Sequence, residues 1–554
     1  MAAAGEHDVM NTTPAELWKQ LRIDWWLPVA GSDKQLSDIG SSEQVVGELQ
    51  MGKRWRQLVE ARRSQLESVL YRHPQRTLEP EAKLKTSSPL LIIAEAQPLM
   101  FLASVWAALL AGWDVALTNH NWGLQEWQSV CQQLQPTLCW GTFIPEVQEL
   151  LPVALPLKSI NAALGSKPLA NKPAIPAYPL HAPPQTSDPS PNYASRILIP
   201  TGGSSGQIKF ACHTWRTLIA AVTGFCHTFT PNATAICSTC VLPLYHVSGL
   251  MQALRVWATG GQFIHIPFKS LETGTAATAG PADAFRCLSL VPTQLQRLLQ
   301  ADRAQYLQQF DAVFLGGAPP WPSLLKRAQS DAIPLCLSYG MTETAAMVTA
   351  LPPGAFLAGD RSSGYPMAHA EVRIERSGQS LPHNQIGQVV ITAASVSGGY
   401  EAIATDSFQG KTYYTDDLGY FDATGALHIT GRVSNKIISG GENIFPTEVE
   451  AAIKATDKVV DVCVFGIPDA QWGEAVTAVY VPTATSVSAK DIKAVLDTTL
   501  SRYKHPKHWI AVNTLSRNAQ GKLSRLQLKH QLQAQLASLS NAAEKLAADV
   551  AADR

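Results

Sequence analysis

The sequence has no excess of charge of either sign: 44 lysines and arginines balance 44 aspartates and glutamates in 554 residues. Nucleic acids and anionic membranes attract basic surfaces, so we expect neither as a partner. Long apolar runs are also lacking, because Glu95 and Pro98 divide the most apolar stretch, residues 89–112. That stretch predicts a buried strand, turn and helix rather than a transmembrane segment. The charge balance favours an enzyme that acts on small molecules.

A secretory signal and a regular cysteine pattern are lacking as well. Residues 1–16 carry acidic side chains and no basic segment followed by an apolar run, so we expect a cytoplasmic protein. The nine cysteines are scattered, which suits reduced thiols. Cys237 and Cys240 form a CxxC inside the apolar run 236–242. Without a second pair, they predict core residues of a strand rather than a zinc or redox site.

The chain is too long for a single hydrophobic core, so we expect a large and a smaller domain. From about residue 89, short apolar runs alternate with helical patterns, which predicts a parallel, doubly wound sheet. A proline-rich segment at 151–191 predicts a surface connection. The alternation then resumes up to residue 337, as if one sheet continued across the domain. Short runs from residue 370 predict antiparallel strands that close this domain.

After Gly431 the pattern becomes that of a compact α+β unit of about a hundred residues. We therefore predict an α/β protein, with a large N-terminal domain of doubly wound mixed sheets that ends in a β-subdomain, and a small mobile α+β C-terminal domain. The boundaries are 1–431 for the large domain, 432–435 for a hinge, 436–530 for the small lid domain and 531–554 for a helical or frayed tail. Residues before about 85 show amphipathic helical patterns without assignable chemistry.

A loop of small residues, PTGGSSGQIKF at 200–210, is rich in groups that bind phosphate. Glycines let backbone N–H groups approach anionic oxygens, hydroxyl groups add donors, and Lys209 supplies a cation. The loop follows the apolar run 196–199 and precedes a helical pattern, so we expect a strand to pass into a helix here. It is not a Walker A loop, because two residues separate Gly206 from Lys209, and it is not a GxGxxG motif.

Further motifs follow in order: LSYGMTE at 337–343, YYTDDLG at 413–419, GRVSNKIISGGENIFP at 431–446 and RNAQGK at 517–522. Together with the loop, they closely resemble the acyl-adenylate-forming superfamily of acyl-CoA synthetases, luciferases and peptide-synthetase adenylation domains, from about residue 89 to 525. The resemblance implies a reaction in two steps. A carboxylate and ATP would give acyl-AMP and pyrophosphate, and coenzyme A would then displace AMP to form a thioester. The implied cofactors are ATP, Mg²⁺ and coenzyme A, with a small-molecule carboxylic acid as the other substrate.

The resemblance also implies roles for individual residues. Four would be catalytic: Lys522, His246, Thr342 and Glu343. Glu343 would hold Mg²⁺, since this hard ion selects carboxylate and water ligands. ATP would be bound by residues of the loop and of later motifs: Thr201, Gly202, Gly203, Ser204, Ser205, Gly206, Lys209, Gly317, Ala318, Pro319, Tyr339, Gly340, Met341, Thr342, Asp417 and Arg432. An acyl pocket would be lined by His246, Ser248, Gly249, Arg255, Thr293 and Gly316.

The small domain would serve both steps by rotating about Ser434. The side that then admits coenzyme A would be formed by Ser439, Gly440, Gly441 and Glu442. Some positions depart from the residues usual in the family: serine is usual at Gly202, proline at Ile208, a small residue at Asp416, and Asp or Lys at Ser434. The extra glycine makes the phosphate loop more mobile, which predicts weaker ATP binding. We expect the rotation to survive with Ser434, and we assign Asp416 a structural role only.

The segment 242–250, LPLYHVSGL, followed by Arg255, resembles most the o-succinylbenzoate-CoA ligases of menaquinone and phylloquinone synthesis. Their substrate is an aromatic keto acid with two carboxylates, and Arg255 is our candidate partner for the second. A surface or intersubunit salt bridge is an equal alternative for Arg255. For the whole chain, the alternatives are a general aryl or fatty acyl-CoA synthetase and, from another class, a non-catalytic nucleotide-binding protein. We also consider a homodimer.

Overall fold

The structure is a computed structural model that describes residues 57–67, 88–141, 143, 195–202, 208–232, 234–275, 280–439, 442–469, 472–497, 499–515 and 525–532. Four β-sheets organise these residues. Several predictions lie outside the described residues: the connection at 151–191, the loop residues Gly203, Ser204, Ser205 and Gly206, the pair Gly440 and Gly441, Lys522, and the tail beyond residue 532. Within the described ranges, no helix combines the length and apolarity that crossing a bilayer requires.

The first sheet has the strand order β3-β1-β2-β4-β5. Its parallel strands are β1 (Leu90–Ala94), β2 (Asp114–Leu117), β3 (Leu138–Gly141) and β4 (Arg196–Gly202), and β5 (Ile208–Thr214) is antiparallel to β4. The helices α3 (Pro98–Leu110) and α4 (Leu124–Leu134) connect the early strands. The prediction that the phosphate loop joins a strand to a helix is wrong. Residues 208–214 pair along β4 instead, so the loop joins two strands.

The second sheet has the order β12-β11-β10-β9-β8-β6-β7. Its strands are β6 (Ile236–Cys240), β7 (Gln262–His265), β8 (Phe285–Leu290), β9 (Ala312–Leu315), β10 (Leu335–Met341), β11 (Ala346–Ala350) and β12 (Tyr365–Pro366), of which the first five are parallel. Its helices are α7 (Trp215–Phe229), α8 (Val247–Thr259), α9 (Phe268–Thr273), α10 (Pro292–Gln300), α11 (Ala304–Leu307), α12 (Pro322–Ser330) and α13 (Pro353–Leu357). Cys237 and Cys240 are fully buried in β6, which confirms them as core residues.

The main hydrophobic core lies between these two sheets. It contains apolar side chains of α3, α7 and α8 together with residues of both sheets. Trp106 of α3 is fully buried in this core, and its ring centroid lies 4.9 Å from that of Trp257 and 5.6 Å from that of Trp215. The expectation of one continuous sheet is therefore wrong. The chain reverses after β4 and crosses through α7, and burying that helix on both sides requires two sheets.

The third sheet is the antiparallel β-subdomain that closes the large domain, as predicted. It has the order β14-β13-β15-β17-β16, and β18 pairs with β17. The strands are β13 (Ala370–Arg376), β14 (Gln379–Ser380), β15 (Gly387–Ala393), β16 (Phe408–Gln409), β17 (Thr412–Phe421) and β18 (Leu427–Arg432). The long strand β17 carries residues of the YYTDDLG motif, so this sheet positions part of the candidate site.

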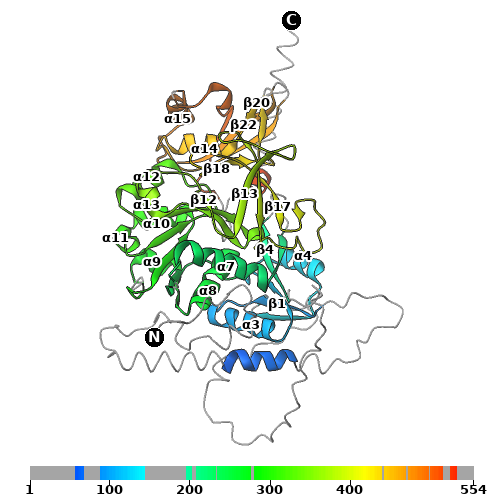
Figure 1. The fold of residues 1–554 in the computed structure, drawn as a ribbon. Helices are drawn as coiled ribbons and strands as arrows, with labels where there is room; N and C mark the ends of the chain where they lie inside the picture. Colours follow the sequence, from blue (N-terminus) through cyan, green and yellow to red (C-terminus); the bar gives the residue numbers. More distant parts are fainter. Residues whose placement is uncertain are drawn as a thin grey trace, which may run out of the picture.

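The fourth sheet forms the small α+β domain at the top of Figure 1. It contains β19 (Ile437–Ser439), β20 (Glu442–Ile444), β21 (Val459–Asp469), β22 (Gly473–Pro482) and β23 (His508–Ala511). Its helices are α14 (Pro446–Lys454), α15 (Ala489–Leu496), the 3₁₀ turn η5 (Arg502–Lys504) and α16 (Arg525–Gln531). The domain contacts the large one where the Thr447 hydroxyl donates to the Thr430 carbonyl at 2.9 Å and where the Lys454 ammonium lies 4.1 Å from the Trp321 ring centroid.

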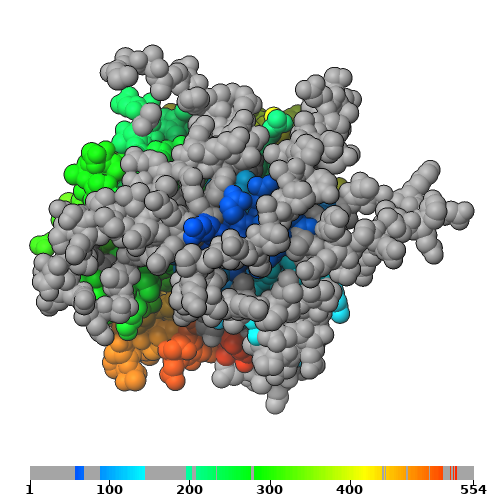
Figure 2. Space-filling view, turned by 90° about the horizontal axis from the view of Figure 1, so that it is seen from below, coloured from blue at the N-terminus to red at the C-terminus, as the bar shows by residue number. Residues whose placement is uncertain are grey.

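A helix at residues 57–67 packs beneath α3, at the bottom of Figure 1 and on the face shown in Figure 2. Val59 and Leu66 of this helix are fully buried. Arg62, only 2% exposed, pairs with Glu95 just after β1 at 2.8 Å between Nη1 and Oε1. Its guanidinium also lies 5.0 Å from the Trp140 ring centroid. The amphipathic pattern in this part of the sequence therefore forms a helix that anchors to the first sheet.

Candidate functional site

A pocket lies at the carboxyl ends of the parallel strands of the second sheet, where the start of α8 faces the ends of β8, β9 and β10. Ligands of open α/β sheets bind at this edge. The pocket collects eight of the predicted site residues: His246, Ser248, Arg255, Gly316, Gly317, Gly340, Met341 and Thr342. Other predicted residues do not line it: Gly249, Thr293, Ala318, Pro319 and Tyr339.

The start of α8 brings His246 and Ser248 to the pocket. His246 is the N-cap of this helix, and its ring centroid lies 4.3 Å from that of Tyr245. Packing requires glycine at position 249, since a Cβ atom there would lie 2.2 Å from the Pro243 carbonyl oxygen. The glycine thus lets the helix approach the preceding loop closely, which places His246 at the pocket wall.

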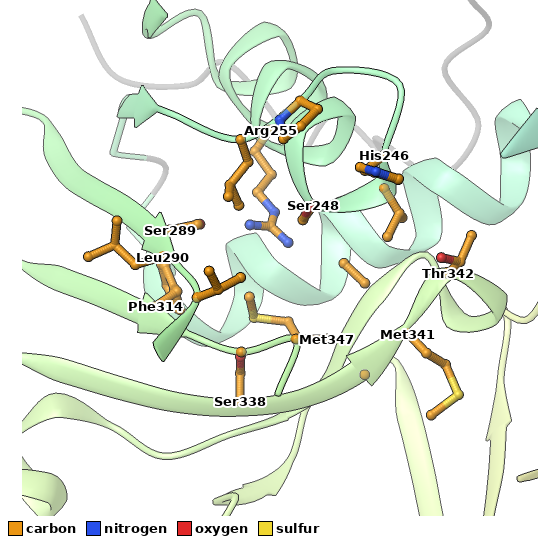
Figure 3. Close-up of a pocket in the computed structure, with 18 residues that line it drawn as sticks. His246, Ser248, Arg255, Ser289, Leu290, Phe314, Ser338, Met341, Thr342 and Met347 are labelled. Atoms are coloured by element: carbon orange, nitrogen blue, oxygen red, sulfur yellow. The ribbon is translucent and has the colours of Figure 1, made fainter. Parts of the chain in front are cut away.

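Arg255 reaches the same pocket from the next turns of α8 and is only 3% exposed. Its guanidinium carbon lies 4.0 Å from the centroid of the Phe225 ring. Nε has no hydrogen-bond partner, and no carboxylate among the described residues forms an ion pair with this side chain. Figure 3 shows the guanidinium directed toward the space between Ser248, Ser289 and Met347. Burial excludes an exposed surface salt bridge, the first of the two alternatives for this residue.

The charge of Arg255 persists despite its burial. Burial lowers the pKa of Arg255 to about 10, although the nearby Cys287, Cys226 and Cys336 oppose this shift. A group with that pKa remains protonated at neutral pH. An unpaired buried cation is costly, so the pocket is electrostatically prepared for an anion.

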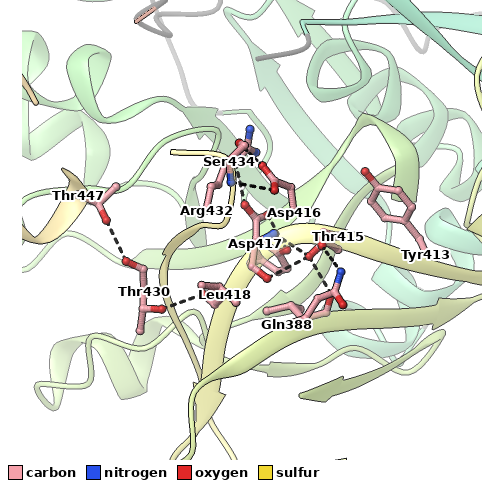
Figure 4. Close-up of polar contacts among 12 residues, drawn as sticks. Gln388, Tyr413, Thr415, Asp416, Asp417, Leu418, Thr430, Arg432, Ser434 and Thr447 are labelled. Carbon is pink, nitrogen blue, oxygen red and sulfur yellow. Dashed lines mark hydrogen bonds and ion pairs between the residues drawn. The ribbon is translucent and has the colours of Figure 1, made fainter. Parts of the chain in front are cut away.

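A second group of residues surrounds Asp417, on β17 beside the domain junction (Figure 4). The Tyr339 hydroxyl donates to Oδ2 of Asp417 at 2.8 Å, and Nε of Arg432 donates to Oδ1 at 2.8 Å. Antiparallel pairing of β17 with β18 places Asp417 directly opposite Arg432. Burial, followed by the charge of Asp417, raises the pKa of Tyr339 well above its usual value, so the phenol remains a donor. Two residues from separate motifs, Tyr339 and Arg432, thus converge on the carboxylate of Asp417.

Glu343 lies in the short 3₁₀ turn η4 (Thr342–Thr344) that follows β10, and it is 6% exposed. Its Oε1 accepts a hydrogen bond of 2.6 Å from the Tyr400 hydroxyl, and no described residue donates to Oε2. No group of three or more His, Cys, Asp or Glu side chains that could hold a metal occurs in the described part of the chain. A single carboxylate with a free oxygen fits Mg²⁺, which protein sites hold through one or two carboxylates together with phosphate oxygens and water.

The phosphate loop is described only at its two ends. Thr201 pairs with Lys209, and Gly202 with Ile208, across the β4–β5 hairpin. The Lys209 ammonium lies 5.2 Å from the centroid of the Tyr400 ring. Since Tyr400 also holds Glu343, the base of the loop lies close to the turn that carries this acid.

In the small domain, Ser439 of β19 pairs with Glu442 of β20 and with Gly473 of β22. Ser439 is buried and Glu442 is exposed. At the junction, the Ser434 backbone N–H donates to Oδ1 of Asp416 at 3.1 Å, and the Ser434 hydroxyl donates to Oδ2 (Figure 4). Two departures from the family pattern therefore contact each other.

Sequence reasoning missed Tyr400 and His213. Tyr400 contacts Glu343 from 57 residues away, and His213 contacts the Thr342 carbonyl from 129 residues away. Tyr400 follows the glycine pair 398–399, and His213 is a lone histidine in the strand IKFACHT. Neither local pattern indicates which residue accepts the hydrogen bond.

Comparison with known proteins is consistent with this geometry. A family model for "AMP-binding enzyme" matches residues 76–401, more than half of the chain, and one for "AMP-binding enzyme C-terminal domain" matches residues 448–522. A 2-succinylbenzoate--CoA ligase of Enterococcus faecalis is 32% identical over 337 residues, which cover 59% of this chain and 68% of that protein. The ligase of the same name from Oceanobacillus iheyensis is 34% identical over 288 residues, covering 51% of this chain and 59% of that protein.

Solved structures share the fold. The o-succinylbenzoate CoA synthetase of Bacillus subtilis, in complex with its acyl-adenylate intermediate, superposes with a TM-score of 0.70 at 22% identity, covering 86% of this chain and 93% of that one. ATP-bound MatB from Rhodopseudomonas palustris gives a TM-score of 0.68 at 25% identity, covering 86% and 92%. The predicted resemblance is thereby confirmed: this chain belongs to the AMP-binding enzyme family.

Proposed function

We propose that this chain is an ATP-dependent acid–CoA ligase whose acid substrate is 2-succinylbenzoate. In the first step the acid and ATP would form acyl-AMP and pyrophosphate, and in the second the thiol of coenzyme A would displace AMP. The relatives named 2-succinylbenzoate--CoA ligase support this activity, although the matched regions span 59 to 68% of the two relatives described above. The family match supports the nucleotide chemistry.

Arg255 is the single observation that carries the choice of acid. The substrate has two carboxylates, of which one must react with ATP and one must be held. The pocket offers an unpaired buried guanidinium at Arg255, while Thr342 and His246 line other parts of the same pocket. A carboxylate bound to Arg255 would form a charge-assisted pair and offset the desolvation of both groups. A monocarboxylic acid would leave the cation unpaired.

For the nucleotide, we propose that Asp417 binds the ribose hydroxyl groups, since a carboxylate that already accepts from Tyr339 and Arg432 retains lone pairs for further donors. The hairpin loop between Thr201 and Lys209 would bind the β- and γ-phosphates. Glu343 would hold Mg²⁺ through its free oxygen, and the ion would supply charge neutralisation on the phosphate oxygens.

In the first step, Thr342 would donate to the α-phosphate and His246 would orient the reacting carboxylate. We propose that Lys522 contacts the reacting carboxylate and the α-phosphate, and that losing this cation would slow the step about a hundredfold to a thousandfold. The fixed donors in this pocket would stabilise the charge that moves toward pyrophosphate without reorganising.

For the second step, we propose that the small domain rotates about Ser434, so that Ser439, Glu442 and the glycines between them face the acyl-AMP. The exposed Trp472 adjoins the Gly473 that pairs with Ser439, and the Lys507 ammonium lies 4.5 Å from its ring centroid. An aromatic face beside a lysine suits the adenine and phosphate groups of coenzyme A.

Mass detection of CoA thioesters tests the activity. The full-length chain is incubated with ATP, Mg²⁺ and coenzyme A, and with 2-succinylbenzoate, benzoate, coumarate or a medium-chain acid in turn. We expect one dominant product from 2-succinylbenzoate. Preference for benzoate, coumarate or the medium-chain acid would instead identify a general aryl or fatty acyl-CoA synthetase.

Pyrophosphate release separates an enzyme from a non-catalytic nucleotide-binding protein. We expect release by the wild type with 2-succinylbenzoate and a large loss in Lys522→Ala. Equal rates for both would favour the binding protein.

We propose that the chain acts in the cytoplasm, because none of its nine cysteines forms a disulfide and reduced thiols suit that compartment. Cell fractionation with an antibody tests this. We further propose a homodimer, which light scattering of the purified chain would detect at twice the monomer mass.

A further inference from the structure

The turn at Thr342 and Glu343 has a backbone that local sequence does not favour. Directly after it, Ala345 and Ala346 have φ angles of 54° and 83°, in the left-handed region that disfavours side chains with a Cβ. Such residues cost on the order of 1 to 3 kcal/mol each and persist only where surrounding structure determines them. The turn is therefore held from outside.

His213 on β5 provides the first of these external contacts. Its side chain is fully buried, Nε2 lies 2.7 Å from the Thr342 carbonyl oxygen, and Nδ1 lies 2.9 Å from the Thr217 hydroxyl. A carbonyl oxygen can only accept, so Nε2 carries the hydrogen and donates it. Burial lowers the pKa of His213 to about 4, although the bond to Thr342 opposes this, so the ring is a neutral donor at physiological pH. The main chain of Thr342 is thus fixed to β5.

Tyr400 provides the second contact, on the side chain of the next residue. Its hydroxyl donates to Oε1 of Glu343 at 2.6 Å. The Ser397 backbone N–H, in the same segment as Tyr400, donates to the Glu343 carbonyl at 2.8 Å. Both the carboxylate and the main chain of Glu343 are therefore held by residues 397–400.

The two contacts belong to one unit. The segment of Tyr400 pairs with β5, since Tyr400 forms an antiparallel bridge with Ala211 and Cys212 exchanges backbone hydrogen bonds with residues 398 and 399. His213 lies next to Cys212 on the same strand. Because β5 is also the strand that leaves the phosphate loop, a single strand connects that loop with the Thr342–Glu343 turn.

We propose that His213 and Tyr400 are positioning residues that fix the Thr342–Glu343 turn relative to the phosphate loop, His213 through the Thr342 carbonyl and Tyr400 through one oxygen of the Glu343 carboxylate. With Oε1 occupied by Tyr400, Oε2 is the atom left for Mg²⁺. The proposal rests on the proposed function, which assigns Thr342 to the α-phosphate and Glu343 to the metal. Residues that orient a metal ligand usually affect metal affinity or activity about 10- to 100-fold.

The Tyr400 arm is tested by metal binding, which needs no turnover. Mn²⁺ is titrated into the full-length protein saturated with a non-hydrolysable ATP analogue, and bound metal is measured by electron paramagnetic resonance against a sample with the analogue alone. We expect Tyr400→Phe to weaken Mn²⁺ binding about tenfold without changing the melting temperature by more than a few degrees. Tyr420→Phe is the matched control, since Tyr420 stacks on His428 in the β-subdomain, and it should bind Mn²⁺ as the wild type does.

The His213 arm is tested by rescue. His213→Leu introduces an apolar side chain of similar size and removes the hydrogen-bond donor. We expect the rate of pyrophosphate release at saturating ATP to fall about 10- to 100-fold in this variant. His213→Gln places an amide N–H near the position of Nε2, and it should recover most of that rate. A merely structural histidine would lower the melting temperature in both variants and would not separate their rates.

The outcomes distinguish the two proposals. If the wild type releases pyrophosphate but Tyr400→Phe binds Mn²⁺ normally, or if the Leu and Gln variants of His213 release it equally fast, the positioning role is wrong and the proposed function stands. If the wild type activates none of the acids, the proposed function fails, and the Mn²⁺ titration alone decides whether Tyr400 positions Glu343.

Discussion

The backbone N–H and the hydroxyl of Ser434 both donate to the carboxylate of Asp416, at the point where the chain passes from β18 to β19. The Val433 N–H also donates to the Asp416 carbonyl, at 2.8 Å. The neighbouring residue on β17, Asp417, holds Tyr339 and Arg432. Adjacent carboxylates on one strand therefore have different partners: Asp417 binds Tyr339 and Arg432, and Asp416 binds the link between the domains.

The segment between β18 and β19, residues 433–436, should detach from β17 more often when the Asp416 side chain is removed. Arg432 and Lys436 flank Ser434, so trypsin can report opening at this place. We expect Asp416→Ala to be cleaved there about fivefold faster than the wild type, because a hydrogen bond to an exposed charged group contributes about 1 kcal/mol. Asp406→Ala, which removes an exposed acid elsewhere in the β-subdomain, should be cleaved at the wild-type rate. Equal rates for both variants would show that Asp416 does not restrain the link.

Replacing Arg255 by Met should separate activity from stability. Truncating one member of a buried charge pair costs about 2 kcal/mol or more, so we expect kcat/KM for 2-succinylbenzoate to fall at least about 30-fold. The melting temperature of the free protein should rise, because the variant no longer buries an unpaired cation. Arg255→Lys keeps the charge and is the matched control. An unchanged preference for the dicarboxylate in Arg255→Met would contradict the role of this residue.

Buried histidines should make the protein less stable in mild acid. Burial lowers the pKa of His213, His265 and His369 to about 4, with the charge of Arg255 adding to the shift at His369. An unfolded histidine has a pKa near 6.5, so below this pH the unfolded state binds more protons than the folded one. Each histidine then contributes full stability above pH 6.5, and this is lost as the pH falls toward 4, by about 2 kcal/mol at pH 5.

Melting temperatures at pH 7 and pH 5 test this. His265 is the residue to replace, since it lies on β7 and does not line the pocket. We expect His265→Gln to lose less stability than the wild type between the two pH values. An identical loss would mean that His265 titrates normally in the folded protein.

Removing one member of the Arg62–Glu95 ion pair should lower the free energy of unfolding more than removing both members. Removing one partner leaves an uncompensated buried charge, so Glu95→Ala should destabilise the protein by about 3 to 5 kcal/mol in urea unfolding. The double variant Arg62→Met with Glu95→Leu removes both charges and should recover most of this loss. Hydrogen exchange of residues 57–67 should increase in the single variant. A double variant as unstable as the single one would contradict the argument.

Local patterns predicted the elements better than their assembly. The antiparallel β-subdomain begins at Ala370, as the short runs indicate, and the CxxC cysteines are buried in a strand. The division into two sheets was not predictable, because it depends on the antiparallel pairing of β5 with β4 and on the burial of α7 between layers. Alternating apolar runs indicate that strands exist, but they do not state which strands are neighbours.

The candidate site shows the same division. Two successive sequence motifs predicted Asp417 and Arg432 as site residues, and the β17–β18 register places the two opposite each other. Arg255 followed from the chemistry of a second carboxylate. Tyr400 and His213 act on residues far away in the sequence, and each donates one hydrogen bond whose acceptor is known only once the chain is folded.

The helix at 57–67 belongs structurally to the large domain, although it lies ahead of the family match. A fragment trimmed to the family match would start at residue 76 and would lack Arg62. Glu95 would then be left as a solitary anion at the end of β1, among side chains that were packed against Val59 and Leu66. Expression of a shortened large domain should therefore start ahead of residue 57, because the first strand of the sheet depends on a cation supplied from outside the recognised family boundary.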